Sequence, residues 1–130
     1  MSLTNNVTKE DILRISGTNP SKCMQCGKCS GACPSYDEME YHPHQFVAMV
    51  RKGQIEKLMA SDSIYKCLSC FACLERCPRN VEPSKLIEAV RVAVVRQQGM
   101  NYMKPDDLPA KLDDKMPQQA LVSAMRKYSK

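Results

Sequence analysis

The stretch Cys67-Leu-Ser-Cys70-Phe-Ala-Cys73-Leu-Glu-Arg-Cys77-Pro78 decides the fold of this chain. A near-copy precedes it at Cys23-Met-Gln-Cys26-Gly-Lys-Cys29-Ser-Gly-Ala-Cys33-Pro34, and both runs read C-x2-C-x2-C-x3-C-P. All eight cysteines of the chain fall in these two runs. Each cysteine lies 44 positions from its counterpart, as Cys23 does from Cys67, so the two runs form an internal repeat.

The spacing within each run is the ligand pattern of proteins that carry two [4Fe–4S] clusters. Soft thiolate ligands suit iron–sulfur clusters, and three closely spaced thiolates reach three irons of one cubane. The proline after each fourth cysteine fixes φ and stops a helix from continuing, so the loop ends there. The sequence therefore predicts two [4Fe–4S] cofactors, with all eight cysteines as metal ligands.

The fourth cysteine of each run is expected to bind the cluster of the other run. This is the general rule for two-cluster ferredoxins with this motif, and the longer step into proline sends the fourth side chain away from its own run. One cluster then takes Cys23, Cys26, Cys29 and Cys77, and the other takes Cys67, Cys70, Cys73 and Cys33. We also expect Gly27 and Gly31 to let backbone N–H groups approach the first cluster.

Zinc sites and disulfides are the alternative interpretations of the cysteines. Structural zinc sites usually pair two short Cys-x-x-Cys segments that are distant in sequence, and the third and fourth cysteines of each run add nothing for zinc. A disulfide framework needs an oxidising compartment, and no secretion signal is visible. The duplicated ferredoxin pattern is much more specific than either alternative.

Composition predicts one domain that depends on its metal centres. The chain has 130 residues, two phenylalanines and no tryptophan, so its conventional core is small, and small domains often rely on metals. The formal charge is +5. Two oxidised clusters with their thiolates carry roughly −2 each, which leaves roughly +1 and gives little support to nucleic-acid binding.

Helix signals surround the cysteine runs, and the segment between the runs, residues 34–66, does not alternate as a strand would. Thr8 with Asp11 approximates a capping box and Gly17 is a stop signal, so a short helix with Ile12, Leu13 and Ile15 facing inward precedes the first run. Residues 43–60 predict two short helices joined at Gly53. His42 and His44 stand at their entry, where we expect solvated side chains rather than metal ligands.

A longer helix is predicted from Pro83 to about Gln98, closed by Gly99. Val92 and Val95 fall opposite its apolar side, where they are either ordinary surface or a partner-binding face. The remaining residues are rich in proline and aspartate, with a short helix expected over 118–128.

Three regions follow from these signals: an N-terminal helix and lead-in over residues 1–19, a two-cluster domain over 20–100, and a partner-docking or flexible tail over 101–130. The start resembles neither a signal peptide nor a transit peptide. The longest apolar stretch, residues 92–95, is too short to span a membrane. We therefore expect a cytoplasmic protein without a membrane span.

The joined pattern resembles the C subunit of heterodisulfide reductase over roughly residues 20–102. The likeness rests on the first cysteine run, on Met49-Val-Arg-Lys-Gly53, on Ser63-Ile-Tyr-Lys-Cys67, and on Cys73-Leu-Glu-Arg-Cys-Pro78 followed by the helix Leu86–Arg96. The resemblance implies a mainly α fold, an α-helical ferredoxin with two pseudo-repeated cluster-binding loops. This agrees with the helices that the sequence predicts on its own.

The resemblance also implies a function: a non-catalytic subunit that carries electrons from a flavin-containing A-type subunit to a catalytic B-type subunit that reduces a disulfide. The eight cysteines match the ligands of that family one for one. A free two-cluster ferredoxin and the iron–sulfur subunit of another dehydrogenase remain open as alternatives. A zinc-stabilised interaction module is a remote fourth interpretation.

Overall fold

The computed structural model describes residues 6–96, 106 and 109–128, and this part of the chain contains helices and no strands. The described residues form two compact units that divide between Val95 and Arg96. The first unit contains α1 (Lys9–Ser16), η1 (Pro20–Lys22), α2 (Lys28–Gly31), η2 (Tyr36–Glu38), α3 (Pro43–Arg51), α4 (Ile55–Ala60), α5 (Ser63–Lys66), α6 (Ala72–Arg76) and α7 (Pro83–Val95). The predicted mainly α fold is confirmed.

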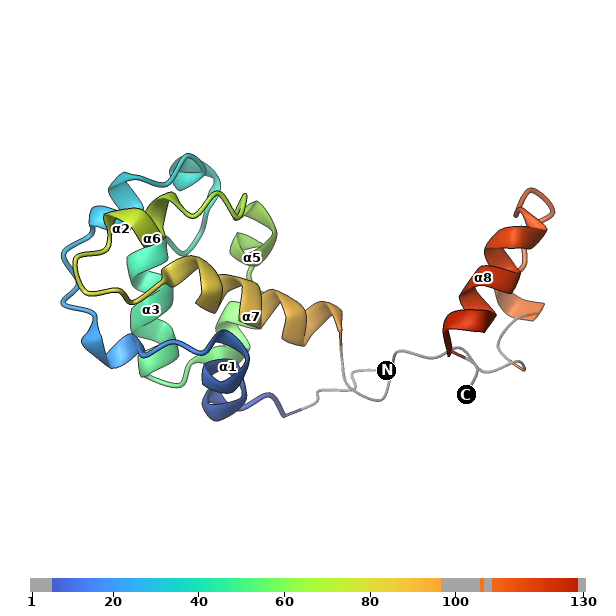
Figure 1. Ribbon diagram of the computed structural model, residues 1–130, viewed down its shortest axis with the longest axis horizontal. Helices are drawn as coiled ribbons and strands as arrows, with labels where there is room; N and C mark the ends of the chain where they lie inside the picture. Colours follow the sequence, from blue (N-terminus) through green and yellow to red (C-terminus); the bar gives the residue numbers. More distant parts are fainter. Residues whose placement is uncertain (1–5, 97–105, 107–108, 129–130) are drawn as a thin grey trace. The chain divides into compact units, whose positions relative to one another are not determined.

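Helix α7 is the centre of the first unit (Figure 1). Helices α1, α3, α4, α5 and α6 all contact it, and one buried apolar cluster joins them. Its largest fully buried side chains include Phe46, Ile12, Leu58, Ile64, Leu86 and Ile87. Each such side chain contributes roughly 1.5–3 kcal/mol through burial. Cys23, Cys33, Cys67 and Cys77 pack against the same cluster, so the cysteine loops are part of the core rather than appendages to it.

Helix α1 starts and ends as predicted. The Thr8 hydroxyl accepts a bond from the Asp11 N–H at 3.3 Å, and the Asp11 carboxylate accepts one from the Thr8 N–H at 3.0 Å. Gly17 ends the helix at φ 65°, a left-handed conformation that favours glycine. Ile12 is fully buried, but the inward position predicted for Ile15 is wrong, because its side chain is 46% exposed. Ile15 lies in the last turn of α1, which ends at Ser16.

The hairpin predicted over residues 43–60 is confirmed. Helix α3 ends at Arg51, Gly53 turns the chain at φ 75°, and α4 begins at Ile55. Phe46 and Val50 are fully buried, which packs α3 against α7. The hairpin therefore brings the entry residues Pro43 and His44 to the cysteine loops.

Helix α7 is shorter than predicted, since it ends at Val95 and Arg96 lies in a bend. The predicted continuation over 97–98 and the stop at Gly99 lie outside the described residues. Val92 and Val95 are 42% and 61% exposed, in agreement with their predicted position away from the core. The apolar side of the helix, including Leu86 and Val90, is fully buried.

The second unit contains η4 (Pro109–Lys111) and α8 (Gln118–Tyr128). Helix α8 has the bounds predicted from the sequence. Leu121 is half-buried and Val122 is exposed. The docking or flexible role expected for residues 101–130 stays a prediction. Across the described residues, no helix has the length and apolar character needed to cross a membrane.

Candidate metal centres

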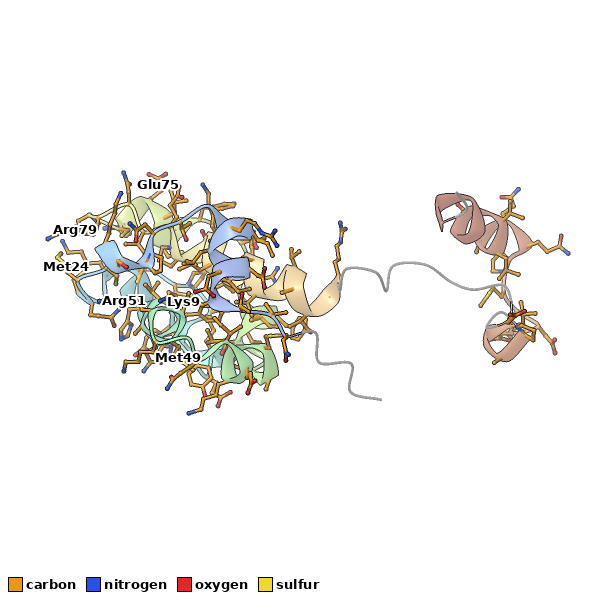
Figure 2. The ribbon with its side chains drawn as sticks, turned by 90° about the horizontal axis from the view of Figure 1, so that it is seen from below. Lys9, Met24, Met49, Arg51, Glu75 and Arg79 are labelled. Atoms are coloured by element: carbon orange, nitrogen blue, oxygen red, sulfur yellow. The ribbon has the colours of Figure 1, made fainter. Side chains whose placement is uncertain are left out.

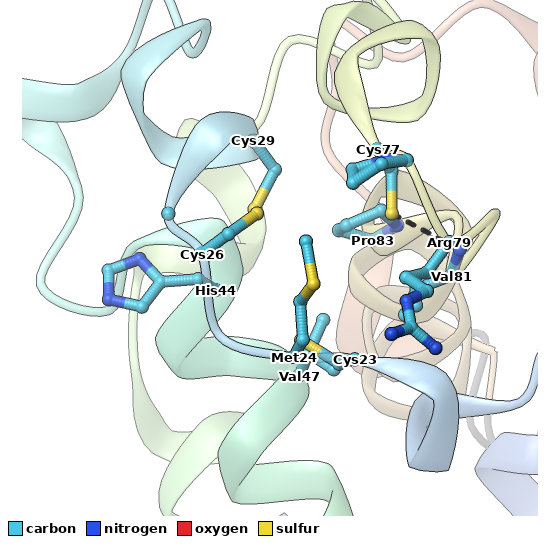
Figure 3. Close-up of a pocket in the computed structure, with 12 residues that line it drawn as sticks. Cys23, Met24, Cys26, Cys29, His44, Val47, Cys77, Arg79, Val81 and Pro83 are labelled. Carbon is cyan, nitrogen blue, oxygen red and sulfur yellow. Dashed lines mark hydrogen bonds between the residues drawn. The ribbon is translucent and has the colours of Figure 1, made fainter.

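The first unit contains two cavities lined by cysteines, and each draws its cysteines from both runs. The first cavity is lined by Cys23, Cys26, Cys29 and Cys77 together with Val47, Val81 and Pro83 (Figure 3). It holds about 340 Å³ of space that opens to the surface. Three of its cysteines come from the first run, and the fourth comes from the end of the second run.

The second cavity reverses this arrangement. It is lined by Cys67, Cys70, Cys73 and Cys33, with Met39, Phe71 and Ile87 around them, and holds about 330 Å³. The near-equal volumes and the 3 + 1 division of cysteines make the two cavities pseudo-equivalent. Each cavity gathers the four cysteines predicted to hold one cluster, and neither gathers the four cysteines of a single run.

The backbone of the two loops repeats as closely as their sequence does. Gln25 and Ser69, which are 44 positions apart, have φ values of 57° and 52°. Gly27 and Phe71, also 44 apart, have φ values of 76° and 61° and are the N-cap residues directly before α2 and α6. A left-handed phenylalanine is strained by roughly 1–2 kcal/mol. Such strain persists where surrounding structure enforces it, as in a ligand-binding loop.

Helices α2 and α6 lie side by side (Figure 1) and are too short to carry a whole run. Helix α2 contains Cys29 and ends before Cys33, while α6 contains Cys73 and ends before Cys77. The third and fourth cysteines of each run therefore belong to different local structures. This division lets the fourth side chain leave its own loop and line the neighbouring cavity.

Two arginines anchor the loops to the helices, and the sequence analysis missed both. Arg51 donates to the carbonyl of Cys23 at 3.2 Å, and Arg91 donates to the carbonyl of Cys67 at 2.9 Å. A second repeat in the sequence could have revealed them. Arg51 lies eight positions after Pro43, which begins α3, and Arg91 lies eight positions after Pro83, which begins α7.

Neither histidine is simply solvated, so that expectation is wrong. The His44 ring bonds the Ser30 hydroxyl through Nδ1 at 2.5 Å, and His44 lines the first cavity. Its backbone N–H also donates to the same hydroxyl at 3.2 Å. The His42 ring stacks on Tyr36 with 3.8 Å between ring centroids. Both side chains are half-buried by contacts that bring α3 against the loop of the first run.

Burial sets the ionisation of the inner cysteines. It raises the pKa of the Cys29 thiol to about 11, and it also raises the pKa of Cys33 and of Cys73. Thiolates at these positions are unfavourable unless a bound cation compensates their charge. Metal binding must therefore release protons here, as it does at other thiolate sites.

The donor sets fit [4Fe–4S] clusters. Each cavity offers four sulfur atoms and an otherwise largely apolar lining, which would lower the polarity around a bound cluster and so tune its potential. Among the described residues, no group of three or more His, Cys, Asp or Glu side chains is arranged around a single metal ion. A cubane carries its four irons at separate corners, so its thiolates stand further apart than those around one ion.

Comparison with known proteins agrees with this chemistry. Residues 19–81 match a family described as "4Fe-4S dicluster domain". Between 65% and 74% of the chain also aligns with the C subunits of several curated heterodisulfide reductases. The chain is a homologue of the heterodisulfide reductase C subunit. With eight cysteines in a dicluster domain, the homologue binds two [4Fe–4S] clusters.

Three relatives show the extent of the similarity. The C2 subunit of the H(2)/formate:CoB-CoM heterodisulfide,ferredoxin reductase of Methanococcus maripaludis is 38% identical over 88 residues, which cover 68% of this chain and 46% of the relative. The C iron-sulfur subunit of the CoB--CoM heterodisulfide reductase of Methanopyrus kandleri is 33% identical, over 65% of this chain and 40% of the relative. The C subunit of the H(2):CoB-CoM heterodisulfide,ferredoxin reductase of Methanothermobacter thermautotrophicus is 30% identical, over 74% and 50% respectively. This homologue of the C subunit thus spans about half or less of these relatives.

Proposed function

We propose that this chain is a non-catalytic electron-transfer subunit of a heterodisulfide reductase-like complex. The observation that carries the proposal is the pair of cysteine-lined cavities in one small unit, each completed by a cysteine from the other run. Bound clusters supply one-electron storage at each cavity. The protein contributes their position, a largely apolar surrounding and the groups around their sulfurs.

The proposed ligands follow the two cavities. Cys23, Cys26, Cys29 and Cys77 hold one cluster, and Cys67, Cys70, Cys73 and Cys33 hold the other. Because each cluster then joins both runs, the 44-residue repeats are tied together twice. This cross-linking keeps the two electron carriers in one rigid unit, as a relay between partner proteins requires.

The proposed partners come from the family relationship. A flavin-containing A-type subunit delivers electrons, and a catalytic B-type subunit uses them to reduce a disulfide. The names of the relatives specify a CoB–CoM heterodisulfide for those proteins. We also propose a cytoplasmic location, because the reducing environment there keeps the cluster ligands from forming disulfides.

Mild affinity purification of the chain from its native host, under anaerobic conditions, tests this function. We expect a brown complex with about eight irons per copy of this chain, a flavoprotein and a further cysteine-rich subunit. The control is the Cys26→Ser, Cys70→Ser double variant, which lacks one proposed ligand at each cluster. It shows whether recovery of the partner subunits depends on intact clusters. Isolation of the iron-loaded chain as a lone monomer would favour a free ferredoxin. Recovery with zinc in place of iron would refute both functions.

A further inference from the structure

The two cavities are built from the same repeat, so corresponding positions can be compared one by one. The residue directly before the second cysteine of a run is Gln25 in the first run and Ser69 in the second run. The residue after the Cys-Pro pair is Arg79 at the first cavity and Ser35 at the second. At both positions the first cavity has a long side chain with N–H donors where the second has serine.

We propose that Gln25 and Arg79 give the cluster held by Cys23, Cys26, Cys29 and Cys77 a higher reduction potential than the other cluster. The proposal rests on the two-cluster function above and assigns different roles to the two cavities. Reduction adds one electron, and hence one negative charge, to a cluster and its thiolates. Groups that stabilise negative charge therefore favour the reduced form and raise the potential.

Gln25 supplies hydrogen bonds to a sulfur of the first cavity. Its side-chain Nε2 donates to Cys23 Sγ at 3.0 Å, and its backbone N–H approaches the same sulfur at 3.4 Å. The same Nε2 also donates to the His44 carbonyl at 3.1 Å, which holds the amide in place. For Ser69, no hydrogen bond to a cysteine sulfur is found within the described part of the chain.

Arg79 supplies a positive charge. Its side chain lines the first cavity, close to Met24 at one end of the unit (Figures 2 and 3). Ser35, at the corresponding place in the second cavity, is buried and neutral. Because Arg79 is exposed, water screens its effect, but one full charge beside a cluster still favours the reduced form.

The acidic residues that follow each Cys-Pro pair in sequence increase the difference. Asp37 and Glu38 lie two and three positions after Ser35, in η2, and so follow the second cavity's Cys33 closely in sequence. At the first cavity, Val81 takes the position that corresponds to Asp37. Glu82 corresponds to Glu38, but its carboxylate is paired with Lys85 at 2.9 Å. Among the described residues, the segment after Cys33-Pro34 therefore has more negative charge outside ion pairs than the segment after Cys77-Pro78.

Several other groups near the cavities match and cancel. Arg51 and Arg91 donate to equivalent carbonyls, and Lys22 and Lys66 precede their runs at the same offset. Cys26 and Cys70 are both exposed. The Val81 N–H donates to Cys77 Sγ at 3.4 Å. At the second cavity, burial raises the pKa of Cys33 and the Ser35 backbone partly offsets this rise. Gln25, through its hydrogen bond to Cys23 Sγ, and Arg79, which lines the first cavity, are the differences on which the proposal rests.

A redox titration of the iron-loaded chain with dithionite, followed by electron paramagnetic resonance at constant pH, tests the proposal. The test variant is Gln25→Ser with Arg79→Ser, which installs the residues of the second cavity. Ser69 already has a φ value close to that of Gln25, so serine fits this backbone. The first reduction step of the titration belongs to the cluster of the first cavity. At a fixed potential near this step, we expect the reduced-to-oxidised ratio of that cluster to fall roughly tenfold, which corresponds to a potential lowered by about 59 mV for one electron. The potential of the second step, which belongs to the other cluster, should not change.

The reciprocal variant Ser69→Gln adds the amide donor to the second loop. It should raise the reduction potential of the second cluster and so reduce the difference between the two potentials. Iron content and total spin signal equal to wild type show that both clusters are present. The proposal is overturned if the double variant moves the lower-potential step, moves both steps equally, or moves neither. In those cases the chain is still a two-cluster carrier, whereas a chain without iron–sulfur clusters would refute the proposed function as well.

Discussion

Cys77 lines the same cavity as Cys23, although the two belong to different cysteine runs and one stands near each end of the cluster-bearing region. Cys33 and Cys67 share the second cavity in the same way. All four of these cysteines also pack against the apolar cluster around α7. The metal sites and the core therefore form one structure. Loss of a cluster should destabilise the core, and a disrupted core should weaken cluster binding.

Removal of iron should unfold the first unit. Without metal, the eight thiols lose the bonds that join the two repeats, and the loops that pack on α7 lose their support. Anaerobic chelation should therefore abolish most of the helical circular dichroism, and reconstitution with iron and sulfide should restore it. Helical signal that survives complete loss of iron would contradict this expectation.

Arg91→Ala should destabilise the holo-protein more than Arg51→Ala. The half-buried Arg91 donates to the Ile64 carbonyl at 2.6 Å and to the Cys67 carbonyl at 2.9 Å. Loss of hydrogen bonds from a charged group costs roughly 1.5–3 kcal/mol each. Arg51 is exposed and donates one bond, at 3.2 Å. Anaerobic denaturant titration of both variants measures the difference, and equal midpoints would show that the Arg91 bonds do not matter.

The exposed Val92 and Val95 are predicted to bind a partner subunit. Val92→Glu with Val95→Glu should prevent complex formation and leave the iron content unchanged, because charge at a desolvated apolar contact is costly. The control is Ile15→Glu, which adds one negative charge at an exposed apolar residue of α1, outside the tested face. If the double variant still co-purifies with its partners, this face is ordinary surface.

Local signals made much of the fold predictable. The Thr8–Asp11 capping box, the turn at Gly53 and the proline at the start of α7 act within a few residues, so sequence alone reveals them. The cysteine spacing revealed the two metal centres for the same reason. Residues 97–105, which include the predicted helix stop at Gly99, are not among those described.

Contacts that depend on packing were not predictable. The bond between His44 and Ser30, and the bond from Gln25 to the His44 carbonyl, exist because α3 folds back onto the first loop. Arg51 and Arg91 were missed because they do not follow the 44-residue spacing of the cysteines. They lie 40 positions apart, as do Pro43 and Pro83, which begin α3 and α7. The connection from Cys77 to Pro83 is shorter than that from Cys33 to Pro43, which shifts one repeat against the other.

Crossed ligation is the central claim, and electron paramagnetic resonance of reduced single variants tests it most directly. Cys23→Ser and Cys67→Ser provide the reference signals for damage to the first and second cluster. The account predicts that Cys77→Ser disturbs the signal altered in Cys23→Ser, and that Cys33→Ser disturbs the signal altered in Cys67→Ser. If Cys77→Ser instead reproduces the change seen in Cys67→Ser, each run binds its own cluster and the account is wrong.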